Sequence, residues 1–206
     1  MTRNRSTIRC HGARRAHRGV TLIEVLIVVV ILGIAGVMVI PSMANVGVLR
    51  IQSAVRTLVG DITYIQSEAL ANQSRYVMAL GRVAQLNDEG VWEVVEGNGY
   101  TIFAPPPGAA AVNVASPIDV LFDPLDNGRP MSRDFTEEQF AGAQIEDVDF
   151  NDGELLIFDE LGGPVLNLTS DDPGAGGSLR VVGTDSAFLV TVEAFTGRVE
   201  VIRVDP

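Results

Sequence analysis

The chain has 206 residues, with 26 acidic residues and 15 basic residues, and its formal net charge is −11. Every basic residue is arginine. This length fits one domain with an appendage. The charge is uneven, because residues 1–18 carry six arginines and no acid, whereas residues 51–206 carry 25 acids and eight arginines. A body this acidic repels phosphate backbones, which disfavours nucleic acid as a partner.

The residues with the most versatile side-chain chemistry all lie near the N-terminus. Cys10, His11 and His17 are the only cysteine and histidines, and the chain has no lysine. If this segment is removed, no side chain is left for a thiol nucleophile, a histidine base, a disulfide or a zinc site. The composition therefore predicts a protein that is not an enzyme and needs no cofactor.

An apolar segment follows, from Val20 to Ile40, with Glu24 as its only charge. As a helix rising about 1.5 Å per residue it would span roughly 30 Å, the thickness of a bilayer core. A buried core helix is the alternative. The arginines before it predict that the N-terminus stays in the cytoplasm and that the chain beyond Ile40 crosses the membrane. A carboxylate inside lipid costs about 3 kcal/mol, so Glu24 needs a functional reason.

The start of this segment, Gly19-Val20-Thr21-Leu22-Ile23-Glu24, resembles the cleavage and methylation motif of type IV prepilins and pseudopilins. The resemblance implies that a prepilin peptidase cuts after Gly19 and methylates the new amine of Val20. It also implies that Glu24 is the family's glutamate, which pairs with the amine of a neighbouring subunit. Pro41 matches the family's proline at the end of the apolar segment. The departure is Val20, where the family usually has Phe.

Physical reasoning about the same residues agrees with the resemblance. A new amine on Val20 would lie four residues before Glu24, on the same helix face. A glutamate that reaches the membrane surface is the alternative. Gly33 and Gly36 permit close approach of other helices, and together with Pro41 they weaken the helix locally.

The sequence predicts four segments: a cleaved basic leader (1–19), a membrane and filament-core helix (20–41), an amphipathic helix (42–73) and a β-rich extracytoplasmic domain (74–206) with a variable loop region (105–143). The helix is expected to run without a break to about Asn72. Its apolar stripe follows the i, i+3, i+4, i+7 pattern, with four polar residues on other faces. The stripe is Val55, Leu58, Val59, Ile62, Ile65, Ala69 and Leu70, and the polar residues are Arg56, Asp61, Gln66 and Glu68.

After Ser74 the pattern changes to that of strands, so the predicted fold class is α+β and pilin-like. A hairpin is predicted from Ile145–Phe150 and Glu154–Phe158 around Asn151-Asp152-Gly153. Asp123–Gly142 is predicted to be a surface loop or a short helix. The other predicted strands are Arg75–Leu80, Val91–Val95, Tyr100–Ala104, Ile118–Phe122, Val165–Leu168, Leu179–Val182, Phe188–Ala194 and Val199–Val204.

Part of the body resembles one pseudopilin subgroup, the H-type minor pseudopilins, over Thr57–Leu80, Leu156–Gly163 and the closing hairpin around Thr196-Gly197. The resemblance implies a minor pseudopilin of the type II secretion pseudopilus. It would lie in the bacterial inner membrane with its body in the periplasm. Its partners would be prepilin peptidase, other pilin or pseudopilin subunits, the lipid bilayer and secreted cargo.

Three alternatives remain open. The chain could be a minor pilin of a type IV pilus or DNA-uptake filament, an unprocessed single-pass anchored protein, or a membrane-tethered carboxylate hydrolase. Metal binding is not expected, although calcium at Asp147–Gly153 or among the acids of Asp123–Glu138 stays open. Arg198 and Arg203 could contact DNA, but ion pairs with nearby acids across the strands are the favoured interpretation.

Overall fold

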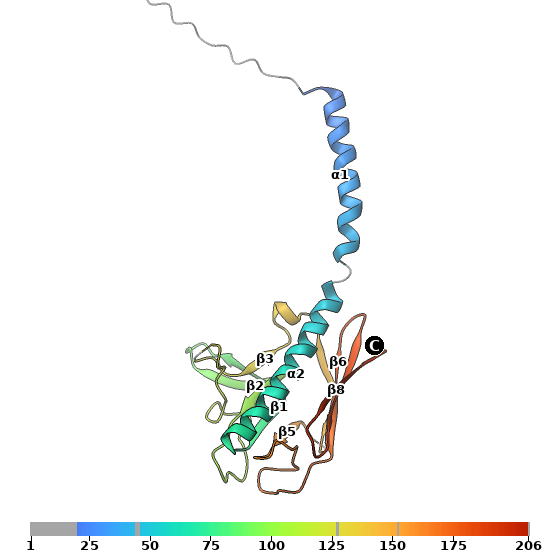
Figure 1. Cartoon of the computed structure of the whole chain (residues 1–206). Helices are drawn as coiled ribbons and strands as arrows, with labels where there is room; N and C mark the ends of the chain where they lie inside the picture. The colour runs from blue at the N-terminus through green and yellow to red at the C-terminus, as the bar shows by residue number, and fades with distance from the viewer. Residues whose placement is uncertain (1–19, 44–45, 127, 152, 206) are drawn as a thin grey trace, which may run out of the picture. The chain divides into compact units, whose positions relative to one another are not determined.

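The structure is a computed structural model that describes residues 20–43, 46–126, 128–151 and 153–205. It divides the chain into two units, Met1–Met43 and Ala44–Pro206. The first unit contains helix α1, Leu22–Met43. The second contains helix α2, Val46–Asn72, followed by the strands (Figure 1). The predicted α+β class, with an N-terminal helical part and a β-rich C-terminal part, is confirmed.

The structure has two helices where one long helix was expected. α1 ends at Met43, two residues beyond Pro41, and α2 begins at Val46. Residues 44–45 lie outside the described residues. The end of α2 at Asn72 has a local cause. Gln73 adopts a left-handed backbone with φ of 47°, and the Ser74 N–H donates to the Ala69 carbonyl at 3.3 Å. This is the hydrogen-bonding pattern of a Schellman cap.

The strands form two four-stranded antiparallel sheets. The first has the order β3-β2-β1-β5, and the second has the order β4-β6-β7-β8. Their bounds are β1 Tyr76–Leu86, β2 Trp92–Phe103, β3 Ser132–Asp134, β4 Gln144–Phe150, β5 Leu155–Phe158, β6 Gly176–Val182, β7 Ala187–Glu193 and β8 Val199–Val204.

The predicted hairpin at 145–158 is wrong. Phe150 and Gly153 do exchange two backbone hydrogen bonds at 3.0 Å, so a tight turn forms. Beyond it the chain separates, because β4 pairs with β6 while β5 pairs with β1. Leu156 and Phe158 of β5 become almost fully buried beside β1. If β5 paired with β4, which is an edge strand of the second sheet, its side chains would be less buried. The burial gained beside β1 therefore decides the pairing of β5, although the turn at Asn151 forms as expected.

The two predicted strands Val91–Val95 and Tyr100–Ala104 form one continuous strand, β2. Gly97 and Gly99 lie between the two predicted stretches. Both glycines mark places where another segment comes close: a Cβ at Gly97 would overlap the Val83 side chain, and one at Gly99 would overlap the Arg133 carbonyl oxygen. Glycine inside a strand is therefore explained here by close approach of the neighbouring strands.

Two other predicted strands, Ile118–Phe122 and Val165–Leu168, form only isolated bridges. Val165 bridges to Pro173, and Phe122 bridges to Pro130. Proline has no N–H to extend a ladder, which accounts for the short pairing. The stretch Asp123–Gly142, expected to be a loop or a short helix, contains β3 and a 3-10 turn, Glu138–Phe140.

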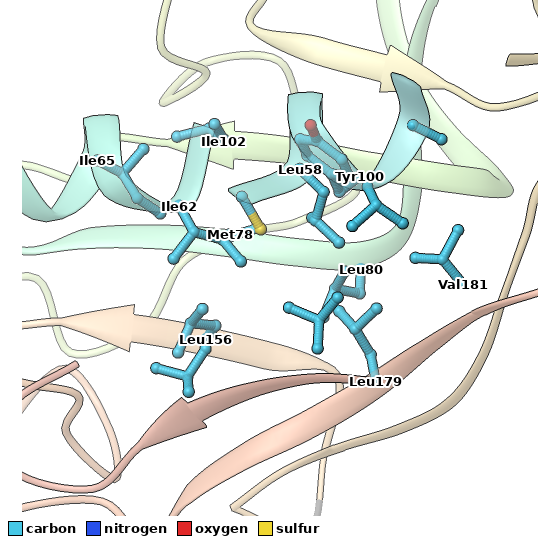
Figure 2. Close-up of a cluster of buried hydrophobic side chains, with 14 of the residues drawn as sticks. Leu58, Ile62, Ile65, Met78, Leu80, Tyr100, Ile102, Leu156, Leu179 and Val181 are labelled. Atoms are coloured by element: carbon cyan, nitrogen blue, oxygen red, sulfur yellow. The ribbon is translucent and has the colours of Figure 1, made fainter. Parts of the chain in front are cut away.

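The main core lies between α2 and the two sheets (Figure 2). Five residues of the predicted α2 stripe are buried: Val55, Leu58, Ile62, Ile65 and Ala69. They meet β1, β2 and β5 through Met78, Leu80, Tyr100, Ile102 and Leu156, and the second sheet through Leu179 and Val181. One stripe of one helix thus joins both sheets, as expected for an amphipathic helix.

Candidate functional site

The predicted processing site lies at the start of α1. Gly19 falls outside the described residues, and Val20 is exposed. Thr21 caps the helix, because its Oγ1 accepts a hydrogen bond from the Glu24 backbone N–H at 3.3 Å. This places Glu24 at the third helical position, where a capping-box glutamate would return a hydrogen bond to the cap residue. That return bond is not among the hydrogen bonds of the described residues, so the Glu24 carboxylate projects from α1 without a partner there.

The α1 side chains that follow are apolar and exposed. Those of the large residues from Leu22 to Ile34 are between 49 and 84% exposed. A Cβ added at Gly33 or Gly36 would meet nothing within 4 Å, so both glycines leave open space at the helix surface. Pro41 lies within the helical backbone of α1. Within the part of the chain that the structure describes, no helix meets the length and hydropathy criteria for a membrane span.

Three charged residues and a tyrosine form a network on one side of α2. The Arg133 Nε donates to Asp61 Oδ2 at 3.0 Å and its Nη1 to Asp123 Oδ2 at 3.1 Å. The Tyr100 hydroxyl donates to the same Asp61 oxygen at 2.8 Å. Asp61 comes from α2, Tyr100 from β2 and Arg133 from β3, so the network ties the helix to the first sheet. Sequence reasoning placed Asp61 on a polar face of the helix, but it is 9% exposed.

The electrostatics of this network point to a structural role. Burial alone would raise the pKa of Asp123, but the Leu125 backbone N–H and Arg133 stabilise its carboxylate and lower that pKa below its usual value. Burial and the nearby Asp61 raise the pKa of the Tyr100 hydroxyl well above its usual range. Both shifts keep these groups in their ordinary charge states at neutral pH. A general acid or base needs the opposite, a pKa moved toward neutrality.

Two further side chains hold the loops at the far end of α2. Gln66 Nε2 donates to the carbonyl oxygens of Gly162 at 2.7 Å and Thr196 at 2.9 Å, and so joins two turns. Arg75 pairs with Glu160 and Asp171 and donates to two backbone carbonyls in the same loop. Sequence reasoning missed both roles. For Gln66 the signal available was a polar residue beside the apolar stripe of α2, which does not reveal its partner.

Three acids of the stretches considered for calcium form ion pairs within the fold. Asp147 pairs with Arg180 at 3.1 Å, Asp123 pairs with Arg133, and Glu137 pairs with Arg129 at 2.8 Å. The side chain of Asn151 bridges the Val165 carbonyl and the Ala175 N–H. Across the described ranges, no three side chains of His, Cys, Asp or Glu gather as a cluster that could hold a metal ion.

Among the described residues, the ion pairs expected on the closing strand are not formed. Neither Arg198 nor Arg203 takes part in any of the seven ion pairs found within the described residues. The register explains this for Arg203, because its partner across the strands is Phe188 rather than an acid. Glu200, an acid of the same strand, is opposite Thr191. The interpretation of Arg203 as half of a cross-strand ion pair was therefore wrong.

Comparison with known proteins supports the N-terminal motif. Residues 14–40 match the family described as the prokaryotic N-terminal methylation motif. No curated protein matches the chain. Two crystal structures of the type IV minor pilin FimU of Pseudomonas aeruginosa PAO1 are 18% identical to it, with TM-scores of 0.42 and 0.41. The matches cover 74 and 73% of this chain and 87 and 91% of those chains.

The matched residues include Gly19, Val20, Glu24 and most of the apolar segment that follows them. The chain therefore carries, in residues 14–40, the N-terminal methylation motif found in type IV pilins.

Proposed function

We propose that this chain is a structural subunit of a pilin-like filament, specifically a minor pseudopilin of type II secretion. Prepilin peptidase cuts after Gly19 and methylates Val20. The segment from Val20 to Pro41 then anchors the subunit in the bacterial inner membrane, with the body from residue 42 onward on the periplasmic side. The match of residues 14–40 to the methylation motif is the observation that carries this proposal.

The geometry of α1 supports an assembly role for Glu24. Its backbone N–H is satisfied by Thr21, while its carboxylate has no partner within the described residues. A charge in apolar surroundings is costly unless it is paired. The methylated amine of Val20 on a neighbouring subunit would supply the opposite charge. The exposed apolar side chains of α1 would bury themselves against the corresponding helices of other subunits and against lipid.

The secretion assignment rests on the resemblance of Thr57–Leu80 and Leu156–Gly163 to H-type pseudopilins. A minor pilin of a type IV pilus would use the same motif, the same anchor and the same Glu24. Genes for secretion components beside the gene for this chain would favour the first assignment. Genes for a retraction motor or for competence would favour the second.

The test compares Glu24→Ala with Glu89→Ala, a matched loss of an exposed acid in the turn before β2. Full-length chains are produced in a host that has the filament machinery. The membrane and sheared-filament fractions are then analysed. We expect Glu24→Ala to be processed normally and retained in the membrane but absent from filaments, whereas Glu89→Ala assembles. If Glu24→Ala enters filaments as the unchanged chain does, the assembly role of Glu24 is wrong.

A further inference from the structure

A groove on the second unit runs between α2 and the edge of the second sheet. It has a volume of about 510 Å³ and is lined by Gln52, Val55, Arg56, Val59, Gly60, Phe188 and Val201. Its floor is apolar, with side chains from α2, β7 and β8. β8 is the last strand of its sheet and pairs only with β7 within the described residues. A groove of this kind fits an apolar side chain carried on a projecting segment.

Arg56 is the one charged residue among the described residues that line the groove, in a body that is strongly acidic. Arg56 lines the groove and is exposed, and it forms none of the ion pairs of the described residues. Arg203 lies opposite Phe188 on the same face of the sheet, also without such a pair. Cross-strand partners project from the same side, so Arg203 borders the groove. The groove therefore suits an apolar residue flanked by carboxylates.

The chain itself presents such a segment. In the loop 118–126, Ile118, Phe122 and Leu125 are 85, 53 and 95% exposed. Asp119 follows the first of these and Asp126 follows the last. Neither acid belongs to an ion pair of the described residues. The loop thus offers apolar side chains with adjacent free carboxylates, which complements the groove in both respects.

The loop is held in place before any partner arrives. The Leu125 N–H donates to Asp123 Oδ1 at 2.9 Å, and the Asp123 carboxylate is fixed by Arg133. The Asp123 N–H donates to the Arg129 carbonyl at 2.8 Å, which closes the base of the turn. Leu125 is therefore almost fully exposed at the end of an anchored turn. Such preorganisation lowers the entropy cost of binding.

The groove and the loop lie on opposite sides of α2. Asp61, which reaches the loop through Arg133, follows Gln52 by nine residues. At 3.6 residues per turn, Gln52 of the groove and Asp61 lie about 180° apart around the helix. In Figure 1, β3 and β8 accordingly lie on either side of α2. A loop on one side that fits a groove on the other gives a head-to-tail contact, which can repeat along a row of subunits without closing.

We propose that the loop 118–126 of one copy of this chain docks in the Arg56–Arg203 groove of a second copy, with Leu125 against Phe188 and Val201. Asp119 and Asp126 would face the two arginines. This proposal rests on the assembly function above and assigns its lateral contact. In a membrane or a filament the contact need not be strong, because α1 already holds the subunits at high local concentration.

Paired cysteines test the contact in the full chain. Cys10→Ser removes the only native cysteine, and Leu125→Cys with Val201→Cys then places one thiol on each surface. The variants are overproduced, so that copies of a minor subunit meet one another in the membrane. After addition of a short thiol cross-linker to these membranes, the double variant should form a ladder of dimers, trimers and longer species. Each single variant should stay monomeric, and co-expression of the two singles should give dimers only. Leu86→Cys with Val201→Cys is the control, because Leu86 is an exposed leucine outside the loop.

A charge exchange checks the complementarity. Arg56→Glu in the double-cysteine chain should lower the ladder yield by about tenfold, because it places like charges together. Adding Asp126→Arg should restore it. A ladder no stronger than that of the Leu86 control, or cross-links only to a different protein, would overturn the docking proposal.

The N-terminus of the same samples, determined by mass spectrometry, separates this proposal from the proposed function. A chain that begins at Val20 but forms no ladder contradicts the docking contact and leaves the assembly function standing. A ladder from chains that still begin at Met1 supports the contact and contradicts the pilin-like function.

Discussion

The two helices are of similar length but place their apolar side chains differently. The large side chains of α1 from Leu22 to Ile34 are all about half exposed or more, on every face of the helix. In α2 the apolar side chains follow one stripe, and Leu58, Ile62 and Ile65 are 0% exposed. Two polar residues of α2 also have partners: Asp61 pairs with Arg133 of the first sheet, and Gln66 donates to two turns.

The difference shows which contacts each helix needs. α2 is completed by strands of its own chain, so its residues should determine the stability of the body. A helix that is apolar all round needs surroundings from outside the chain, such as lipid or other helices. We therefore expect substitutions in α1 to change assembly and substitutions in α2 to change folding. Four predictions test this separation, and all use full-length chain in detergent.

The largest loss of stability is expected from Arg133→Met, which leaves the carboxylates of Asp61 and Asp123 buried without their partner. Breaking a buried ion pair from one side costs about 4 kcal/mol of unfolding free energy. Arg56→Met is the control, an exposed arginine of α2 that should change stability by less than about 0.5 kcal/mol. Denaturant unfolding measures both. Equal small losses would show that the network does not hold α2 to the sheet.

A matched leucine pair compares the two helices directly. Leu58→Ala removes a fully buried side chain from the α2 stripe and should cost about 3 kcal/mol. Leu26→Ala makes the same chemical change on α1, where the side chain is 57% exposed, and should leave unfolding of the body unchanged. Thermal unfolding followed by circular dichroism checks both. The comparison fails if Leu26→Ala destabilises the body as much as Leu58→Ala does.

A smaller effect is expected at the far end of α2. Gln66→Ala leaves the carbonyls of Gly162 and Thr196 without their donor, at a cost of about 1 kcal/mol. The neighbouring Ser67→Ala removes only a hydroxyl that bonds within the helix, and it should be nearly neutral. Hydrogen exchange of the two turns should rise in the Gln66 variant alone. Unchanged protection would mean that these turns do not depend on α2.

The smallest effect concerns pH. Because the folded pKa of Asp123 is lowered, its carboxylate stabilises the fold fully above the usual aspartate pKa of about 4, and the gain is lost as pH falls through the lowered value. Stability should therefore decline below about pH 4, and less steeply in Asp123→Asn. Denaturant midpoints are measured between neutral and acidic pH for the unchanged chain and for Asp123→Asn. If the midpoint falls equally steeply with pH in both chains, the prediction is contradicted.

The sequence predicted an element correctly where the pattern came from residues that are neighbours in the chain. The α2 stripe and the closing strand Val199–Val204 were predicted because helical and strand periodicities are set by neighbouring residues. The hairpin at 145–158 failed because its turn was real but its strands found better burial elsewhere. The two parts of β2 were predicted as separate strands, because a single sequence does not show the segments that approach Gly97 and Gly99.

The candidate sites show the same difference between contacts of neighbouring residues and contacts of residues far apart in the sequence. The motif around Gly19, Val20 and Glu24 could be identified because its residues follow one another closely in the sequence. The network of Asp61, Tyr100, Asp123 and Arg133 joins residues up to 72 positions apart, and no pattern within the sequence links them. The groove and its complementary loop depend on the same long-range packing.

Cleavage after Gly19 can be measured from the intact mass and N-terminal sequence of the chain recovered from membranes of a host with active prepilin peptidase. We expect a chain that begins at N-methylated Val20 and has lost Cys10, His11 and His17. A chain that still begins at Met1 would contradict the claim that α1 is an anchor and assembly helix released by cleavage after Gly19.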